Sequence, residues 1–308
     1  MKDAAEHTFD PTIVARLGRL DWIAESIVDG LRQGIHRSTV RGFSTEFSDF
    51  KPYTPGDDIR LLDWRIYART EKPYVRRFEA ETSMEVSFLV DSSQSMSWRW
   101  EKTVSKQQYA ASLVAGMTWL FLSQQDQVGV VKVAADGVHV LAPSSRRQQL
   151  DRILALLETN AELAGPVVED LLAASLEMRI TRGQVVLVSD LEETAPEAGV
   201  RLAELRGMGH DVMVVHLLDQ AEITLPFPDG TTHLRDHETG EMLRIDLPQL
   251  RLQQTARVRD FRRQWQAVCQ EAGVVYVPLD TGMDYVSAIL TIIESRRSLG
   301  VPAVEVDS

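Results

Sequence analysis

The sequence contains a single cysteine, Cys269, so no disulfide can form within the chain. It also lacks an apolar run that could span a bilayer, because its longest uncharged stretch, residues 107–125, is interrupted by glutamine, serine and threonine. The first ten residues show neither the basic n-region nor the apolar h-region of a secretory signal. We therefore predict a cytoplasmic protein with no membrane span.

Positive charge is scarce, with 33 Lys and Arg against 45 Asp and Glu and a formal net charge of -12 at pH 7. This balance argues against nucleic-acid binding, because phosphate contacts need clustered basic side chains. Residues 32–77 are the exception, with ten basic residues against six acidic ones. Two interpretations of this basic segment remain open: a solvated face that complements the acidic remainder, and an interaction surface.

From Met84 onward, strand-like runs alternate with helix-like runs. The predicted strands are 84–90, 128–133, 137–142, 183–189, 211–218 and 273–279, and the predicted helices are 105–124, 146–158, 169–179, 196–209, 256–272 and 285–297. Short β-branched strands alternating with helices favour parallel pairing with right-handed crossovers. The fold class is therefore α/β, with a doubly wound, mostly parallel, Rossmann-like sheet flanked by helices over residues 82–299.

Two segments depart from this alternation. Residues 221–251 contain the turn sequences PDG and ETG, which predict a β-hairpin excursion. Residues 1–81 are predicted to form an N-terminal extension, with an amphipathic helix from Asp10 to Gly34 followed by short strands and loops. Residues 300–308 are predicted to be a flexible tail.

Two predicted strands end in carboxylates, at Asp91 in "FLVD" and at Asp190 in "VLVSD". Ligands of a doubly wound sheet bind beyond the carboxyl ends of the strands where the winding reverses, so we expect these carboxylates to face each other. Asp91, Ser93 and Ser95 have the spacing i, i+2 and i+4 and can point the same way on a tight loop. Such oxygens suit Mg²⁺ or another divalent cation, so the predicted metal ligands are Asp91, Ser93, Ser95 and Asp190.

The D-x-S-x-S motif at Asp91, Ser93 and Ser95, with a later strand that ends in "SD" at Asp190, resembles the metal-ion-dependent adhesion site (MIDAS) of von Willebrand factor A domains. The block "PYTPGDDIRLLDW" is similar to the signature of the bacterial family of domain of unknown function 58 (DUF58). The later blocks "DHETGEML" and "RLQQTARVRDFRRQW" also look like that family. The resemblance covers roughly residues 30–298.

This resemblance implies an A-domain-like core and a partnership with a MoxR-type AAA+ ATPase in chaperone-like assembly or maturation. Many members of the family carry two N-terminal membrane spans, whereas this chain resembles a short, soluble version. A complete adhesion site also uses a threonine, and this sequence has none between Asn160 and Ile180. Asp170 is a candidate replacement ligand, and a hydrogen-bonded polar cluster without metal is the alternative.

Three functions are compatible with these residues. A protein-interaction adaptor would hold a cation on the four predicted ligands and leave one coordination position for a partner's carboxylate. An enzyme would use Asp91 as phosphoryl acceptor or Ser93 as nucleophile. A structural module would use Asp91 and its serines as caps.

We predict the adaptor, with no enzymatic activity. No lysine follows the relevant strands in a phosphatase-like position, the histidines are scattered, and both GxSxG and GxxxxGK are absent. The predicted partner-binding residues are Arg60, Asp63 and Arg65, where charged and apolar side chains interleave, and Trp98. Trp98 and Trp100 either form an exposed binding patch or pack beneath a loop.

Overall fold

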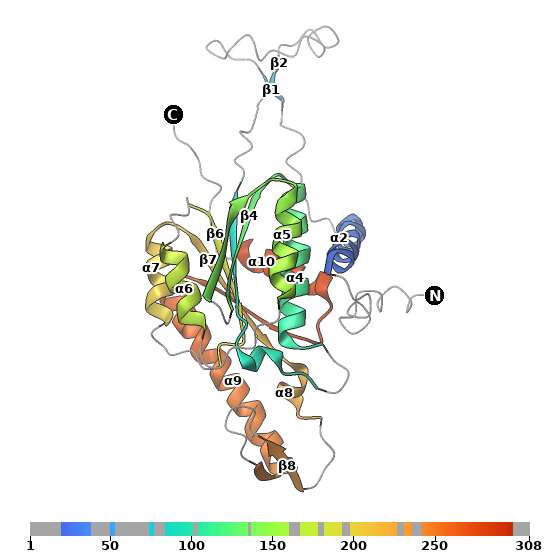
Figure 1. Ribbon diagram of the computed structural model, residues 1–308, viewed down its shortest axis with the longest axis vertical. Helices are drawn as coiled ribbons and strands as arrows, with labels where there is room; N and C mark the ends of the chain where they lie inside the picture. Colours follow the sequence, from blue (N-terminus) through green and yellow to red (C-terminus); the bar gives the residue numbers. More distant parts are fainter. Residues whose placement is uncertain are drawn as a thin grey trace, which may run out of the picture. The chain divides into compact units, whose positions relative to one another are not determined.

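The computed structural model describes residues 20–37, 50–52, 74–76, 84–100, 104–134, 137–159, 167–177, 182–192, 198–226, 231–235 and 242–297 (Figure 1). Contacts divide the chain into two units, one formed by residues 1–32 and 84–308 and the other by residues 33–83. Within the second unit, β1 (Phe50–Pro52) pairs with β2 (Tyr74–Arg76) in an antiparallel arrangement.

The first unit contains a six-stranded sheet in the order β10-β7-β6-β3-β4-β5. Its strands are β3 (Glu85–Val90), β4 (Gln127–Ala134), β5 (Gly137–Ser144), β6 (Gln184–Ser189), β7 (Asp211–Leu218) and β10 (Val275–Asp280). All neighbouring pairs are parallel except β4 and β5, so β5 is an antiparallel edge strand. The structure confirms the predicted mixed α/β fold with a mostly parallel sheet flanked by helices. The winding reverses between β3 and β6, because the chain runs from β3 to β4 on one side and later adds β6 on the other.

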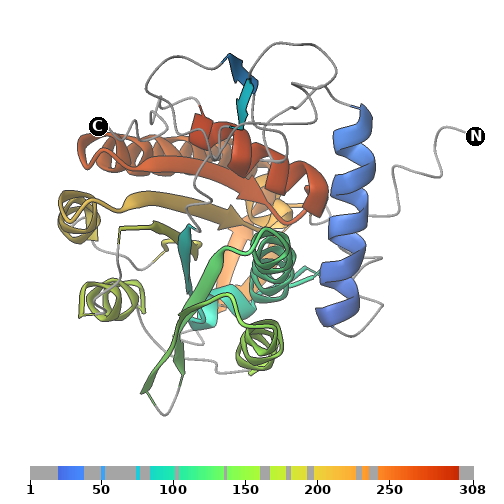
Figure 2. The ribbon, with the colours of Figure 1, turned by 90° about the horizontal axis from the view of Figure 1, so that it is seen from above.

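Helices cover both faces of this sheet (Figure 2). The helices α4 (Lys106–Ser123), α5 (Gln148–Glu158) and α10 (Tyr285–Arg297) share one core with the strands, and α6 (Val168–Glu177), α7 (Ala198–Gly207) and α9 (Leu247–Glu271) share the other. Successive strand residues point to opposite faces, so Phe88 belongs to the first core and Leu89 to the second. The apolar stripe of α2 (Leu20–Arg37) joins the first core, where Ile27 lies against Gly116 of α4.

The long uncharged stretch of the sequence forms α4, which is buried on nearly all sides. The helix begins with a capping box, in which Ser105 accepts a hydrogen bond from the Gln108 amide and Gln108 accepts one from the Ser105 amide. Its middle lies between the sheet and α2, and this interior position accounts for the lack of charged residues after Lys106. Among the helices of the described ranges, none is both long and apolar enough to cross a membrane.

The segment after β7 differs from the prediction in two ways. A short helix, α8 (Gln220–Thr224), follows β7 directly, and α9 begins at Leu247 although the sequence analysis started it at residue 256. Pro248 is compatible with this early start because the first turn of a helix leaves its N–H groups unpaired in any case. Between α8 and α9, β8 (Thr231–Arg235) and β9 (Met242–Asp246) form an antiparallel hairpin. Residues 10–19 of the expected N-terminal helix and the expected tail at 300–308 lie outside the described residues.

Candidate functional site

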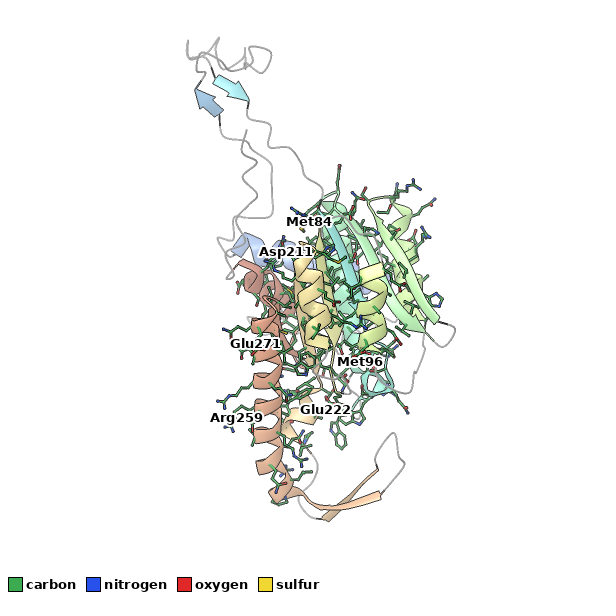
Figure 3. The ribbon with its side chains drawn as sticks, turned by 90° about the vertical axis from the view of Figure 1, so that its left-hand side faces the viewer. Met84, Met96, Asp211, Glu222, Arg259 and Glu271 are labelled. Carbon is green, nitrogen blue, oxygen red and sulfur yellow. The ribbon has the colours of Figure 1, made fainter. Side chains whose placement is uncertain are left out.

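The candidate site lies at the carboxyl ends of β3 and β6, where the winding of the sheet reverses. These strands are neighbours, with Val90 opposite Val188, and the Asp91 amide donates to the Val188 carbonyl at 3.0 Å. Asp91 therefore follows β3 directly beside the Ser189–Asp190 end of β6. Met96 and Glu222 lie at this end of the sheet in Figure 3, and Met84 and Asp211, at the starts of β3 and β7, lie at the other.

The carboxylate of Asp91 is buried, with 2% of the residue exposed, and both of its oxygens accept hydrogen bonds. The Ser93 amide donates to Oδ1 at 2.8 Å, and the Ser189 hydroxyl donates to Oδ2 at 2.5 Å. The hydroxyl oxygens of Ser93 and Ser95 lie 3.0 Å apart, so oxygens from the loop at residues 91–95 converge. Burial, and after it the charge of Asp190, raises the pKa of Asp91 to about 6.

Asp190 is also buried, and a lysine neutralises it. The Nζ atom of Lys106, the first residue of α4, lies 2.7 Å from Asp190 Oδ2 and 2.6 Å from Glu222 Oε1, and its side chain has no exposed surface. Burial alone would lower the pKa of Lys106, but the carboxylates of Asp190 and Glu222 outweigh burial and hold this pKa above its usual value. Lys106 is therefore a permanent positive charge within the site.

Glu222 is held in place by the first turn of α8. Its Oε2 accepts from the Asp219 amide at 2.7 Å, and Asp219 Oδ1 accepts from the Ala221 amide at 2.8 Å, which together form a capping box. Thr281 donates its hydroxyl to the other Asp219 oxygen at 2.8 Å. Burial raises the pKa of Glu222 to about 7 even though Lys106 is in contact with it. One ammonium group thus contacts a buried carboxylate, Asp190, and a partly buried one, Glu222.

The chain leaves the site through a strained residue. Leu191, directly after Asp190, has a φ of 60° and a fully buried side chain. A left-handed conformation costs a non-glycine residue about 1–2 kcal/mol. The Leu191 amide donates to the Ser189 hydroxyl oxygen at 2.8 Å, so the same serine holds this turn and Asp91. Strain of this kind concentrates at functional sites, where the surrounding structure maintains it.

The family model described as "Protein of unknown function DUF58" matches residues 49–264. This chain belongs to the DUF58 family. Relatives of this DUF58 protein include the uncharacterized proteins Rv1480 of Mycobacterium tuberculosis and Mb1516 of Mycobacterium bovis, each 26% identical over 292 residues that cover 94% of this chain and 91% of theirs.

Similar solved structures share much lower identity with this DUF58 protein. An aerotolerance-related membrane protein from Bacteroides fragilis is 18% identical, with a TM-score of 0.44, and the match covers 70% of this chain and 99% of that one. BatB from Bacteroides thetaiotaomicron is 17% identical, with a TM-score of 0.40, and the match covers 70% and 98%.

The structure brings Asp91, Ser93, Ser95 and Asp190 together but leaves other predicted residues apart or outside its described part. Asp170 is exposed on α6, whereas the two site aspartates are buried, and the loop at 160–166 where a threonine was sought lies outside the described residues. The predicted partner-binding residues Arg60, Asp63 and Arg65 also lie outside them.

The two tryptophans beyond the site differ in their surroundings. Trp98 is half-buried directly after the 3₁₀ turn η3 (Gln94–Ser97). Trp100 packs against Leu225, so at this residue the structure favours the packed alternative over an exposed patch.

Lys106 and Glu222 belong to the site although the sequence did not point to them. No lysine follows the relevant strands, and Lys106 instead reaches Asp190 from the start of α4. A lysine in the first turn of a helix opposes the helix dipole, and this unfavourable placement was the available clue. Asp219 is a further carboxylate at a strand end, and its role is to cap α8.

The residues at the site fit a small hard cation in part. Adjacent oxygen ligands of Mg²⁺ lie about 3 Å apart, which matches the separation of 3.0 Å between the Ser93 and Ser95 hydroxyls. Asp91 adds a carboxylate that forms no ion pair with a basic side chain in the described part of the chain. Asp190 is bound to Lys106, and the described residues contain no cluster of three or more His, Cys, Asp or Glu that could hold a metal. The residues that fit as cation ligands are therefore Asp91, Ser93 and Ser95.

Proposed function

We propose that this DUF58 protein is a non-enzymatic protein-interaction adaptor with a von Willebrand factor A-like core. We propose further that it works with a MoxR-type AAA+ ATPase in chaperone-like assembly or maturation. The ATPase partner follows from the family resemblance, whereas the contact site is argued from geometry. The observation that supports this site is the convergence of the Asp91, Ser93 and Ser95 oxygens beside Asp190, where the winding of the sheet reverses.

Recognition at this site would use a partner's carboxylate. Asp91, Ser93 and Ser95 would hold a divalent cation, which would supply a Lewis-acidic position for that carboxylate. Ser95 and Trp98 are half-buried, so they lie at the accessible side of an otherwise buried cluster. Trp98 is suited to this role because tryptophan is enriched among the residues that dominate binding energy in interfaces.

In this proposal, the charge of Lys106 supports the fold, whereas the cation serves partner binding. In the structure, the Lys106 ammonium contacts Asp190 and Glu222, two carboxylates that are not among the fitting cation ligands. Removal of the cation should therefore weaken partner capture while the folded structure persists. A purely structural cluster would instead show no effect of the cation on either property.

The test is capture of a purified MoxR-type ATPase by the full chain in magnesium and in chelator. We expect capture to fall in chelator and in the Asp91→Ala and Ser95→Ala variants, with unchanged circular dichroism spectra for Ser95→Ala. Asp170→Asn is the matched control, because it removes an exposed acid on α6 and leaves the cluster intact. Capture that is unchanged in chelator and with Ser95→Ala would reject the metal-dependent mechanism.

Lys106 also favours a second candidate, metal-dependent phosphoryl transfer from a substrate to Asp91, since a cation beside an acid pair suits that chemistry. Against this candidate, Lys106 is fully buried and its ammonium contacts Asp190 and Glu222, which leaves it withdrawn from a substrate. Hydrolysis of p-nitrophenyl phosphate in magnesium, lost in Asp91→Asn, would establish the enzyme. No turnover above the buffer rate would exclude it for this substrate class.

A further inference from the structure

A groove with a volume of about 430 Å³ lies between α8, α9 and the edge strand β10. Ile223 of α8 and Tyr276 and Pro278 of β10 provide apolar surface, and Arg259, Arg262 and Arg263 of α9 provide positive charge. The volume is within the range of ligand-binding clefts. Figure 3 shows Arg259 on α9 at the same end of the sheet as Glu222, the neighbour of Ile223.

Two of the three arginines have no acidic partner among the residues that the structure describes. Arg262 is half-buried and its Nε has no hydrogen-bond acceptor, and neither Arg262 nor Arg263 forms an ion pair with any residue in the described part of the chain. Arg259 contacts its sequence neighbour Asp260 at 3.3 Å, with both side chains more than half exposed. Unpaired guanidinium groups on a chain with a net charge of -12 form a local basic site that is suited to an anionic ligand.

The edge strand limits how a partner can bind here. β10 pairs with β7 on one side only, so its other side is the edge of the sheet. Pro278 has no N–H to donate, and a partner strand is therefore not expected to extend the sheet past this residue. The Tyr276 hydroxyl already contacts Nδ1 of His216 at 2.5 Å. Recognition consequently depends on the arginines and the apolar surface.

We propose that this groove binds an acidic segment of a partner protein. Carboxylates of the segment pair with Arg262 and Arg263, whose planar guanidinium groups donate bidentate hydrogen bonds, and an apolar side chain packs on Ile223, Tyr276 and Pro278. A peptide fits this groove better than a small anion does, because the groove combines apolar surface with several separate charges.

The groove and the proposed adhesion site share one end of the sheet. Pro278 lies opposite His216 on β7, and His216 lies opposite Ser189 on β6, which donates to Asp91. A single partner can therefore contact both places. Binding in the groove requires no cation at Asp91, so its test is independent of the adaptor mechanism.

The experiment is fluorescence anisotropy of a fluorescein-labelled peptide in which Glu and Asp alternate with Leu, titrated with the full chain in chelator. We expect binding that weakens with added salt, because exposed charge pairs are screened. Arg262→Gln and Arg263→Gln should each raise the Kd about threefold or more, and the double variant about tenfold. Arg257→Gln is the matched control, since Arg257 is an exposed arginine of α9 that does not line the groove.

Each alternative result would overturn the proposal. Equal effects of Arg257→Gln and Arg263→Gln on the Kd would indicate non-specific electrostatic attraction to α9 and no defined binding groove. Full competition by millimolar inorganic phosphate with no contribution from leucine would indicate a small-anion site. Capture by phosphatidylserine vesicles through the same arginines, without peptide binding, would assign the surface to lipid headgroups.

Discussion

Replacement of Lys106 by methionine should strongly destabilise the fold at neutral pH. Methionine has a similar length but no charge, so the variant leaves the buried Asp190 and the partly buried Glu222 without the ammonium that lies 2.7 and 2.6 Å from them. Removal of one partner from a buried ion pair costs about 3–5 kcal/mol. A domain with a typical stability of about 5–15 kcal/mol would therefore lose a large share of its free energy of unfolding.

The pH dependence of this loss follows from Glu222. Burial raises the pKa of Glu222 and Lys106 lowers it, so without Lys106 this pKa rises further above that of the unfolded chain, and the folded variant binds more protons and loses stability as the pH increases. In the wild type, the pKa of Lys106 is raised, so its contribution is present at neutral pH and is lost only in strongly alkaline solution. The deficit of Lys106→Met should therefore be smaller at about pH 5 than at about pH 8.

Urea unfolding followed by tryptophan fluorescence at both pH values measures this deficit. Lys132→Met is the matched control, because Lys132 is equally buried but donates to the carbonyls of Leu156, Leu157 and Thr159 and contacts no carboxylate. A loss below about 1 kcal/mol at pH 8, or the same loss at both pH values, would show that the buried ion pairs do not form in solution.

Three further predictions concern stability. Burial lowers the pKa of Lys132 to about 8, so the unfolded chain holds more protons than the folded chain between pH 8 and 10.5. The wild type should therefore gain stability over that pH range in urea titrations, whereas Lys132→Met should not. Burial raises the pKa of Glu222 to about 7, so the folded chain holds more protons between pH 4.5 and 7. Glu222→Gln should reduce the loss of wild-type stability across this interval and leave the part that Asp91 contributes. In Gly183→Ala, the new Cβ would lie 2.4 Å from the Glu85 carbonyl oxygen and force β6 away from β3. This change should lower the free energy of unfolding by about 1–3 kcal/mol in thermal unfolding. At Gly207 a new Cβ has open space, so Gly207→Ala should change stability by less than about 1 kcal/mol.

The sequence by itself determined the alternation of strands and helices and the meeting of Asp91 with Asp190. The strands at 85–90, 127–134 and 184–189 are short apolar runs. Their hydrophobic pattern is a local property of the sequence and does not depend on which strands pair in the sheet. Once β3 and β6 are parallel neighbours, residues at their carboxyl ends must share one edge of the sheet. This rule is why two strand-end aspartates separated by almost a hundred positions could be predicted to lie together.

Only the tertiary structure decided which other charges reach these aspartates. Lys106 contacts Glu222 across 116 positions of sequence, and no spacing rule connects the first turn of α4 with a short helix after β7. The orientation of Arg262 towards the edge strand β10 likewise depends on how α9 packs, and the sequence shows only a basic helix. Hydrophobic pattern specifies each element and its buried face, whereas ion pairs between distant elements depend on the packing of those faces against one another.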